Sequence, residues 1–300
     1  MIQETVITIL KSFCLVECSA GIIFAVFIML VNFRCWMKGE ILNPSDQIII
    51  ALAFSSAILS GSQGANVMLS TILHNMPIAP AVYTMSFFMS YATFSSSWLG
   101  ACLCFFFFVK MNNLSIGFIA RLKMIIDLLI FWLFLGIQVF SISTACVYTI
   151  RYSKTYMAYL GDLYQPNKTS DYNSPDPFIV GLQTFNCLTP FIIAAVSSGY
   201  IIVSLCQHTQ YMKQNALDGG TKLRTLQRAA RTMIFLLILY LVFYGLSLPM
   251  LFYPDPRNLY WVYFMVLCSF SFTQSIILIQ GNNRLLHTCM KILNRDTNVP

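Results

Sequence analysis

The side chains that most often carry out chemistry are few and scattered in this sequence. Its three histidines, His74, His208 and His287, lie far apart. Membrane desaturases and metalloproteases, in contrast, need histidines grouped at helical spacing to hold iron or zinc. The sequence also has no glycine-rich phosphate loop and no G-x-S-x-G turn that would present a nucleophilic serine. These patterns argue against an enzyme, and they indicate neither a cofactor nor a metal.

Two carboxylates fall within apolar stretches, Glu17 and Asp127. Asp127 follows two basic residues closely and can reach the membrane interface along its own helix. Glu17 is a candidate functional group, because an acid inside a membrane is rare and usually faces a partner or a water-filled cavity. It also fits a place nearer the surface, so both interpretations of Glu17 stay open.

The elements that position these groups are predicted to be membrane helices. Of 300 residues, 57% are hydrophobic and only 10% are charged, whereas soluble domains carry about 25% charged residues. Long stretches contain no charge at all, and a spanning helix needs about 20 mostly apolar residues. The longest one, Gln47–Val109, holds two prolines between His74 and Pro80, which break it into two helices.

The sequence therefore predicts an all-α integral membrane protein with seven spanning helices in a single domain, residues 1–300. The expected spans are residues 8–33, 46–72, 81–109, 124–150, 178–206, 229–252 and 259–280, followed by a short cytoplasmic tail, 281–300. Such a bundle closes its backbone hydrogen bonds within each helix, as the bilayer requires.

Basic residues predict how this bundle is oriented, because Lys and Arg concentrate in cytoplasmic loops. Most of the 18 basic residues lie on one side of the predicted spans if the N-terminus is outside and the C-terminus inside. We therefore expect a multi-pass protein of the plasma membrane. Its net charge of +7 indicates contact with membrane lipid or a partner protein rather than with nucleic acid.

A glycosylation sequon agrees with this orientation. Asn167-Lys168-Thr169 lies in a long loop expected between residues 151 and 177, on the outer side, which predicts a glycoprotein modified at Asn167. A second sequon at Asn113 lies on the expected inner side, where it stays unmodified.

A strong helix-start signal precedes the second expected span. Asn43 suits a helix cap, Pro44 suits the first helical position, and Asp46 stands three residues after the cap. This arrangement is typical of a capping box with an acid near the positive end of the helix.

The same region resembles the type 2 (bitter) taste receptors, and so do segments along nearly the whole chain. The matching motifs are Leu30-Val31-Asn32, Ser45-x-Gln47-Ile48, Leu52-Ala53-x-Ser55, Trp98-Leu99-x-Ala101-Cys102-Leu103, Asn113-Leu114-Ser115, Pro190-Phe191, His208-x-x-x-Met212, Phe235-Leu236-x-x-x-Tyr240 and Ile277-Leu278-Ile279-x-Gly281-Asn282-x-Arg284-Leu285. The hallmarks of rhodopsin-like receptors are missing, including an acid-Arg-Tyr triplet and an Asn-Pro-x-x-Tyr motif.

Three departures mark the chain as a divergent member of that family. The family usually has Arg where Ser56 stands, Asn where Ala25 stands, and often His where Gln274 stands. These changes remove polar groups thought to join spans 1, 2 and 7, so we do not expect the activation network of the family to carry over to this chain.

The resemblance implies a chemosensory G-protein-coupled receptor that binds small, apolar or weakly polar, bitter or toxic molecules in its extracellular half. Met85, Met89 and Thr93 are spaced four apart and therefore share a helix face. By the resemblance, they and three aromatic residues in spans 6 and 7 are candidate ligand contacts. Those aromatic residues are Phe243, Tyr244 and Phe264. Each of the six fits core packing as well.

The resemblance also implies that a heterotrimeric G protein of the gustducin/Gi class binds at the inner surface. Candidate coupling or activation residues there are Lys110, Arg121, Lys123, His208, Met212, Arg224 and Arg231. Basic groups suit a partner helix that ends in a carboxylate, although they also anchor helices in anionic lipid. The tail from Asn282 to Arg295 is predicted to form a short amphipathic helix on the membrane.

Two alternatives remain open on the sequence alone. One is a related chemosensory receptor of the vomeronasal type 1 class. The other is a seven-span transporter, which predicts internal repeats and a polar path across the membrane, and the sequence shows neither.

Overall fold

The computed structural model describes residues 2–40, 42–72, 79–111, 117–163, 176–215, 220–252 and 257–296. These residues form α-helices. The helices are α1 (Ile2–Met37), α2 (Pro44–Ile72), α3 (Ala79–Met111), α4 (Gly117–Leu163), α5 (Pro177–Asn215), α6 (Gly220–Phe252), α7 (Arg257–Gly281) and α8 (Asn283–Asp296).

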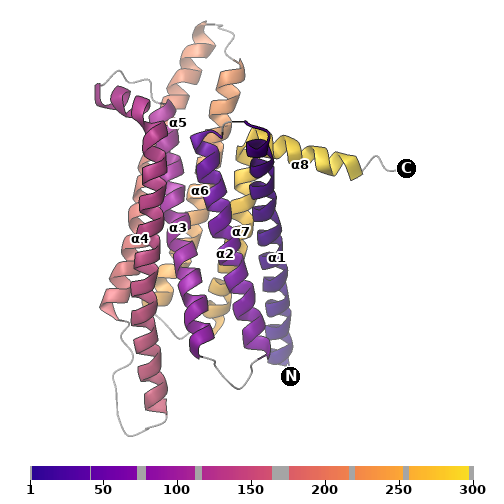
Figure 1. The fold of residues 1–300 in the computed structure, drawn as a ribbon, viewed down its shortest axis with the longest axis vertical. Coiled ribbons are helices and arrows are strands. Elements are labelled where there is room, and N and C mark those ends of the chain that lie inside the picture. The colour runs from indigo at the N-terminus through magenta and orange to yellow at the C-terminus, as the bar shows by residue number, and fades with distance from the viewer. Residues whose placement is uncertain are drawn as a thin grey trace.

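The helices α1 to α7 run alongside one another, whereas α8 leaves the bundle at a steep angle, at the end opposite the start of α1 (Figure 1). Within the described residues, six helices are long and apolar enough to cross a membrane, and α6 carries a shorter apolar stretch, Ala230–Leu246. Each range expected to span the membrane falls inside one of α1 to α7.

The outside of the bundle is apolar and the inside contains many hydroxyl and amide groups. Trp132 and Val196, for example, are 63% and 69% exposed, while Ser56, Ser96 and Gln274 are fully buried. This distribution suits a bilayer, where lipid covers apolar side chains and polar groups must find partners inside the protein.

Helix α3 lies at the centre of the bundle. In α3, 72% of the apolar stretch is buried, against 22% for α4. Helix α3 contacts α2, α4, α5 and α6. Side chains of α3 therefore face four neighbouring helices.

The loop expected after the fourth span is wrong in its first part, because α4 continues through Leu163. Between residues 151 and 163 the only glycine is Gly161, and the next proline is Pro166. Nothing therefore stops the helix where the apolar stretch ends. The helices α5 and α6 likewise extend into the polar segment between the expected fifth and sixth spans.

The helix α2 starts at the predicted proline, but Asp46 does not form the predicted capping box. The helix begins at Pro44, and the carbonyl of Asn43 accepts hydrogen bonds from the N–H groups of Asp46 and Gln47, at 2.9 and 3.2 Å. The Asp46 carboxylate does not serve in a capping box, since its two oxygens bind Asn282 and Arg284. This tertiary interaction replaces the local cap that the spacing predicted.

Candidate functional site

The candidate ligand residues of α3 lie along one side of that helix. Met85, Met89 and Thr93 are all half-buried, and the Thr93 hydroxyl donates to the carbonyl of Met89 at 2.8 Å. The hydroxyl of Thr93 is therefore already paired within its own helix, and the methionines present the flexible apolar surface of this face.

Phe243 and Tyr244 of α6 lie in the largest core cluster, against which Met89 packs. The ring of Phe243 lies 4.6 Å from that of Phe270 in α7 and 5.4 Å from that of Tyr244, centroid to centroid. Phe243 is 2% exposed. The structure therefore brings two of the six candidates, Phe243 and Tyr244, together in an aromatic cluster with Phe270 between α6 and α7.

Phe264 lies in a different cluster. It packs with Cys14 and Cys18 of α1, Val67 of α2 and Cys268 of α7. The sequence placed Phe264 beside the other ligand candidates, but its contacts belong to the α1–α2–α7 side of the bundle.

Glu17 lies in this second region and faces α7. Its Oε1 accepts a hydrogen bond from the Ser269 hydroxyl at 2.6 Å, and the side chain is half-buried. The contact gives the carboxylate a specific partner inside the bundle.

A chain of hydrogen bonds crosses the middle of the bundle, and we call it the middle polar chain. The Ser56 hydroxyl donates to Gln274 Oε1 at 2.9 Å, and Gln274 Nε2 donates to the Tyr240 hydroxyl at 3.1 Å. That hydroxyl donates to the carbonyl of Ser96 at 2.8 Å. The chain thereby joins α2, α7, α6 and α3 in turn, and all four residues are buried.

Two of the departures from the taste-receptor pattern meet in this chain. Ser56 and Gln274 are hydrogen-bonded to each other, while the third position, Ala25, is a fully buried apolar residue. Gly100 of α3 makes room for the chain, because a Cβ there would lie 2.8 Å from ring carbons of Tyr240. Ser56 and Gln274 therefore link α2 to α7, and Gln274 also binds Tyr240 of α6.

Two further polar contacts tie α3 to α5 and α6. Ser97 of α3 and Tyr244 of α6 are hydrogen-bonded through their hydroxyls. The indole N–H of Trp98 donates to Asn186 Oδ1 on α5 at 3.1 Å. The aromatic cluster is thus directly connected to the central helix.

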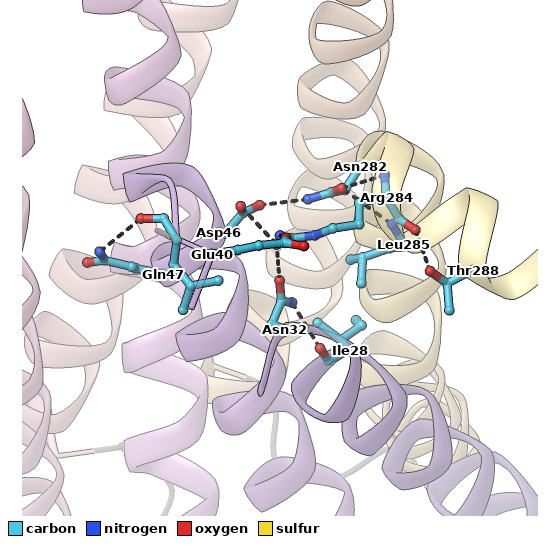
Figure 2. A network of polar contacts seen from close by, with 10 residues as sticks. Ile28, Asn32, Glu40, Asp46, Gln47, Asn282, Arg284, Leu285 and Thr288 are labelled. Carbon is cyan, nitrogen blue, oxygen red and sulfur yellow. Dashed lines mark hydrogen bonds and ion pairs between the residues drawn. The ribbon is translucent and has the colours of Figure 1, made fainter. Parts of the chain in front are cut away.

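A second polar group lies where α8 begins (Figure 2), and we call Asn32, Asp46, Asn282 and Arg284 the α8-end cluster. Asp46 Oδ1 accepts from Asn282 Nδ2 at 2.8 Å, and Asp46 Oδ2 accepts from Arg284 Nη2 at 2.9 Å. Asp46 is 5% exposed. A charge buried to this extent requires a paired cation and hydrogen bonds, and Asp46 has both.

Asn32 joins α1 to this cluster. Its Oδ1 accepts from Arg284 Nη2 at 2.5 Å, and its Nδ2 donates to the carbonyl of Ile28 at 2.9 Å. Glu40, in the turn after α1, lies 3.7 Å from Arg284 Nη1 and is largely exposed. The turn itself uses Gly39 at a φ of +79°, a conformation that glycine adopts without strain.

The candidate coupling residues are only partly described. Lys110 is exposed, with its Nζ 5.1 Å from the centroid of the Phe106 ring, and Arg231 is exposed on α6. The remaining ones lie outside the side chains that the structure describes: Arg121, Lys123, His208, Met212 and Arg224. Asn167 lies outside the described residues altogether.

A cavity of about 610 Å³ lies between α3, α4 and α5, lined by apolar side chains that include Trp98, Trp132, Phe140 and Phe185. Trp132 and Phe185 are exposed on the outside of the bundle. This cavity therefore opens sideways, toward lipid, and is separate from the aromatic cluster at Phe243.

A bundle of apolar helices with buried polar links between them is the architecture of a multi-pass membrane receptor. The sequence profile described as "Taste receptor protein (TAS2R)" matches residues 1–297. The chain is 28% identical to taste receptor type 2 member 8 of Gorilla gorilla gorilla over 289 residues, covering 91% of each chain. It is 27% identical to the human taste receptor type 2 member 39 over 240 residues, or 78% of this chain and 71% of that one.

The chain belongs to the TAS2R family of taste receptors. It is therefore a chemosensory receptor and a multi-pass membrane protein, as predicted, and its relatives are receptors rather than enzymes. This result favours the bitter-receptor interpretation over the vomeronasal and transporter alternatives.

The main residues that the sequence did not identify as functional are those of the two polar groups. Asn32, Asn282 and Arg284 stood within family-like motifs, and Gln274 stood out as a departure from the family. Their positions in the sequence could therefore have marked them as candidates. Their partners could not be assigned, because they lie on other helices.

Proposed function

We propose that this receptor binds small apolar or weakly polar bitter molecules between α3, α6 and α7, and that it activates a G protein of the gustducin/Gi class. It does so as a seven-span bundle with its N-terminus outside, so that the α8 end faces the cytoplasm. Two features support this orientation: α8 and the start of α1 lie at opposite ends of the bundle (Figure 1), and basic residues concentrate on the α8 side.

The observation that carries the ligand assignment is the aromatic cluster of Phe243, Tyr244 and Phe270, which belongs to the extended core against which Met89 also packs. Together with Met89 it combines flexible thioether and aromatic surfaces, which suit ligands of varied shape. It is also linked to the rest of the bundle, because Tyr244 bonds Ser97 and stacks with Tyr240 at 5.9 Å between ring centroids. A ligand that contacts this cluster in one state more than in the other shifts the equilibrium between them.

The test is calcium release from cells that express the chain together with a taste-type G protein, exposed to a panel of bitter compounds. We expect at least one agonist, and we expect Met89→Ala and Phe243→Ala to shift its half-maximal concentration by about tenfold at equal surface level. Phe88→Ala is the matched control, because Phe88 lies beside Met89 but is 40% exposed on the outside of α3.

Identical dose–response curves for Met89→Ala, Phe243→Ala and Phe88→Ala would remove the ligand assignment. A silent wild-type receptor, in cells where a reference receptor activates the same G protein, would contradict the proposed coupling. Agonist responses only through a G protein of another class would correct the partner while leaving the ligand site in place.

A further inference from the structure

Two family-like motifs far apart in the sequence meet at the α8 end of the bundle. Asp46, from the motif at the start of α2, binds both Asn282 and Arg284, from the motif that ends α7 (Figure 2). Neither motif takes part in the ligand cluster. The contact between these two motifs is therefore not explained by ligand binding.

The junction between α7 and α8 is held from several sides within four residues. Asn282 caps α8, since its Oδ1 accepts the backbone N–H of Arg284 at 3.0 Å, while its Nδ2 reaches Asp46 on α2. Arg284 also donates a hydrogen bond to the Asn32 side chain on α1. The junction is thereby fixed to α1 and α2 by charged and amide groups with little exposure to solvent.

At the same junction α6 lies close to α7, at Gly281, the glycine that ends α7. A Cβ added to Gly281 would lie 2.6 Å from Cγ2 and 3.0 Å from Cβ of Thr232. Thr232 is itself buried, and its hydroxyl donates to the carbonyl of Arg228 at 3.0 Å. A change in the position of α6 at this level therefore alters its packing against Gly281, which lies one residue before Asn282.

We propose that Asn282 and Arg284, held by Asp46 and Asn32, are positioning residues for G-protein coupling. They fix the α7–α8 junction against α1 and α2, so that α6 moves relative to a rigid support through the Thr232–Gly281 contact. The inference rests on the proposed coupling function and extends it from the exposed basic residues to a buried cluster that touches no partner itself.

The first test uses the steric contact. Gly281→Ala pushes α6 away from the junction, and we expect it to raise agonist-independent signal per receptor at the cell surface by about fivefold. Thr232→Ala alone removes atoms from the same contact without adding bulk, so we expect it to change the agonist-independent signal by less than Gly281→Ala does. The double variant removes Cγ2 and Oγ1 from the path of the new Cβ, so its signal returns to within about twofold of wild type.

The second test uses the ion pair. Arg284→Gln leaves the buried Asp46 carboxylate without its cation, whereas Asp46→Asn leaves Arg284 only the exposed Glu40 at 3.7 Å as a carboxylate partner. We expect each variant to shift agonist potency by about tenfold. The double variant removes both charges and lies closer to wild type than either single variant. Lys291→Gln is the control, because it removes an exposed positive charge from the same helix.

Several results would overturn the inference. One is a signal per surface receptor equal to that of Lys291→Gln in both single charge variants, even if their thermal stability falls, because the cluster would then be purely structural. Another is an effect of Gly281→Ala that Thr232→Ala fails to reverse. If the Gly281→Ala receptor does not reach the cell surface, the Asp46→Asn and Arg284→Gln variants alone test the positioning role. A silent wild-type receptor contradicts the coupling function itself, whereas a responsive wild type with unaffected variants contradicts only the positioning role.

Discussion

The middle polar chain and the α8-end cluster both link helices of the bundle, the first through neutral groups and the second through charged groups. The chain links four helices through neutral hydroxyl, amide and carbonyl groups. The cluster links α1, α2 and α8 through a carboxylate and a guanidinium. In the middle of a membrane a charge is expensive and a neutral hydrogen bond is sufficient, whereas near the interface a charged side chain keeps partial access to water.

This difference concerns two positions at which the chain departs from the taste-receptor pattern, Ser56 on α2 and Gln274 on α7. The resemblance to the taste receptors leads us to expect Arg at position 56 and often His at position 274, whereas Ser56 and Gln274 are neutral and bonded to each other. The charged Asp46–Arg284 pair is present at the other site. In this chain a neutral pair, Ser56 and Gln274, therefore links α2 to α7.

The largest effect is expected for Gly100→Ala in the middle of the bundle. The added Cβ meets the ring of Tyr240, and overpacking of this kind destabilises the folded protein by about 3 kcal/mol. The thermal midpoint of the detergent-solubilised protein measures it. Gly136→Ala is the control, because no atom lies within 4 Å of a Cβ there, so its midpoint stays unchanged or rises.

A smaller effect is expected for Gln274→Leu. It leaves the hydroxyl of Ser56 without its acceptor and removes a donor to Tyr240, which costs about 2 kcal/mol of unfolding free energy. The loss is independent of salt concentration because no charge is involved. A midpoint equal to that of wild type would show that the middle polar chain contributes nothing to the link.

Ser56→Ala is expected to cost about 1 kcal/mol, because Gln274 keeps its bond to Tyr240. Combined with Gln274→Leu, it should add less than it does alone, since the two residues form one hydrogen bond. Strict additivity of the two losses, measured by thermal unfolding of all four proteins in the cycle, would contradict direct coupling.

The smallest effect is expected for Glu40→Gln at the α8 end. Glu40 is 58% exposed and 3.7 Å from Arg284, so the loss is about 0.5 kcal/mol or less. It should vanish when the midpoint is measured at high salt, because exposed charges are screened. A large loss that persists in salt would mean that Glu40 belongs to the buried cluster after all.

The sequence predicted the helical class and the family from local properties. Uncharged apolar stretches indicated where helices run, and Pro44 marked the start of α2. It misplaced the end of α4, since the limit of an apolar stretch is not the limit of a helix that lacks a breaker. The spanning count, the orientation and the residues outside the described segments remain predictions.

The sequence likewise predicted only part of how the candidate ligand residues are arranged. Phe243 and Tyr244 contact each other and Met89 packs against the same extended core, but Phe264 packs in another cluster with the cysteines of α1 and α7. Spacing along a helix fixes which residues share a face. It does not tell which neighbouring helix that face meets.

Asp46 illustrates what each level decides. The sequence by itself determined that an acid stands in the first turn of a well-started helix, because proline, cap and spacing act within a few residues. Only the tertiary structure decided that this acid binds Asn282 and Arg284. A buried charge takes the strongest partner within reach, and that partner lies more than two hundred residues away in the sequence.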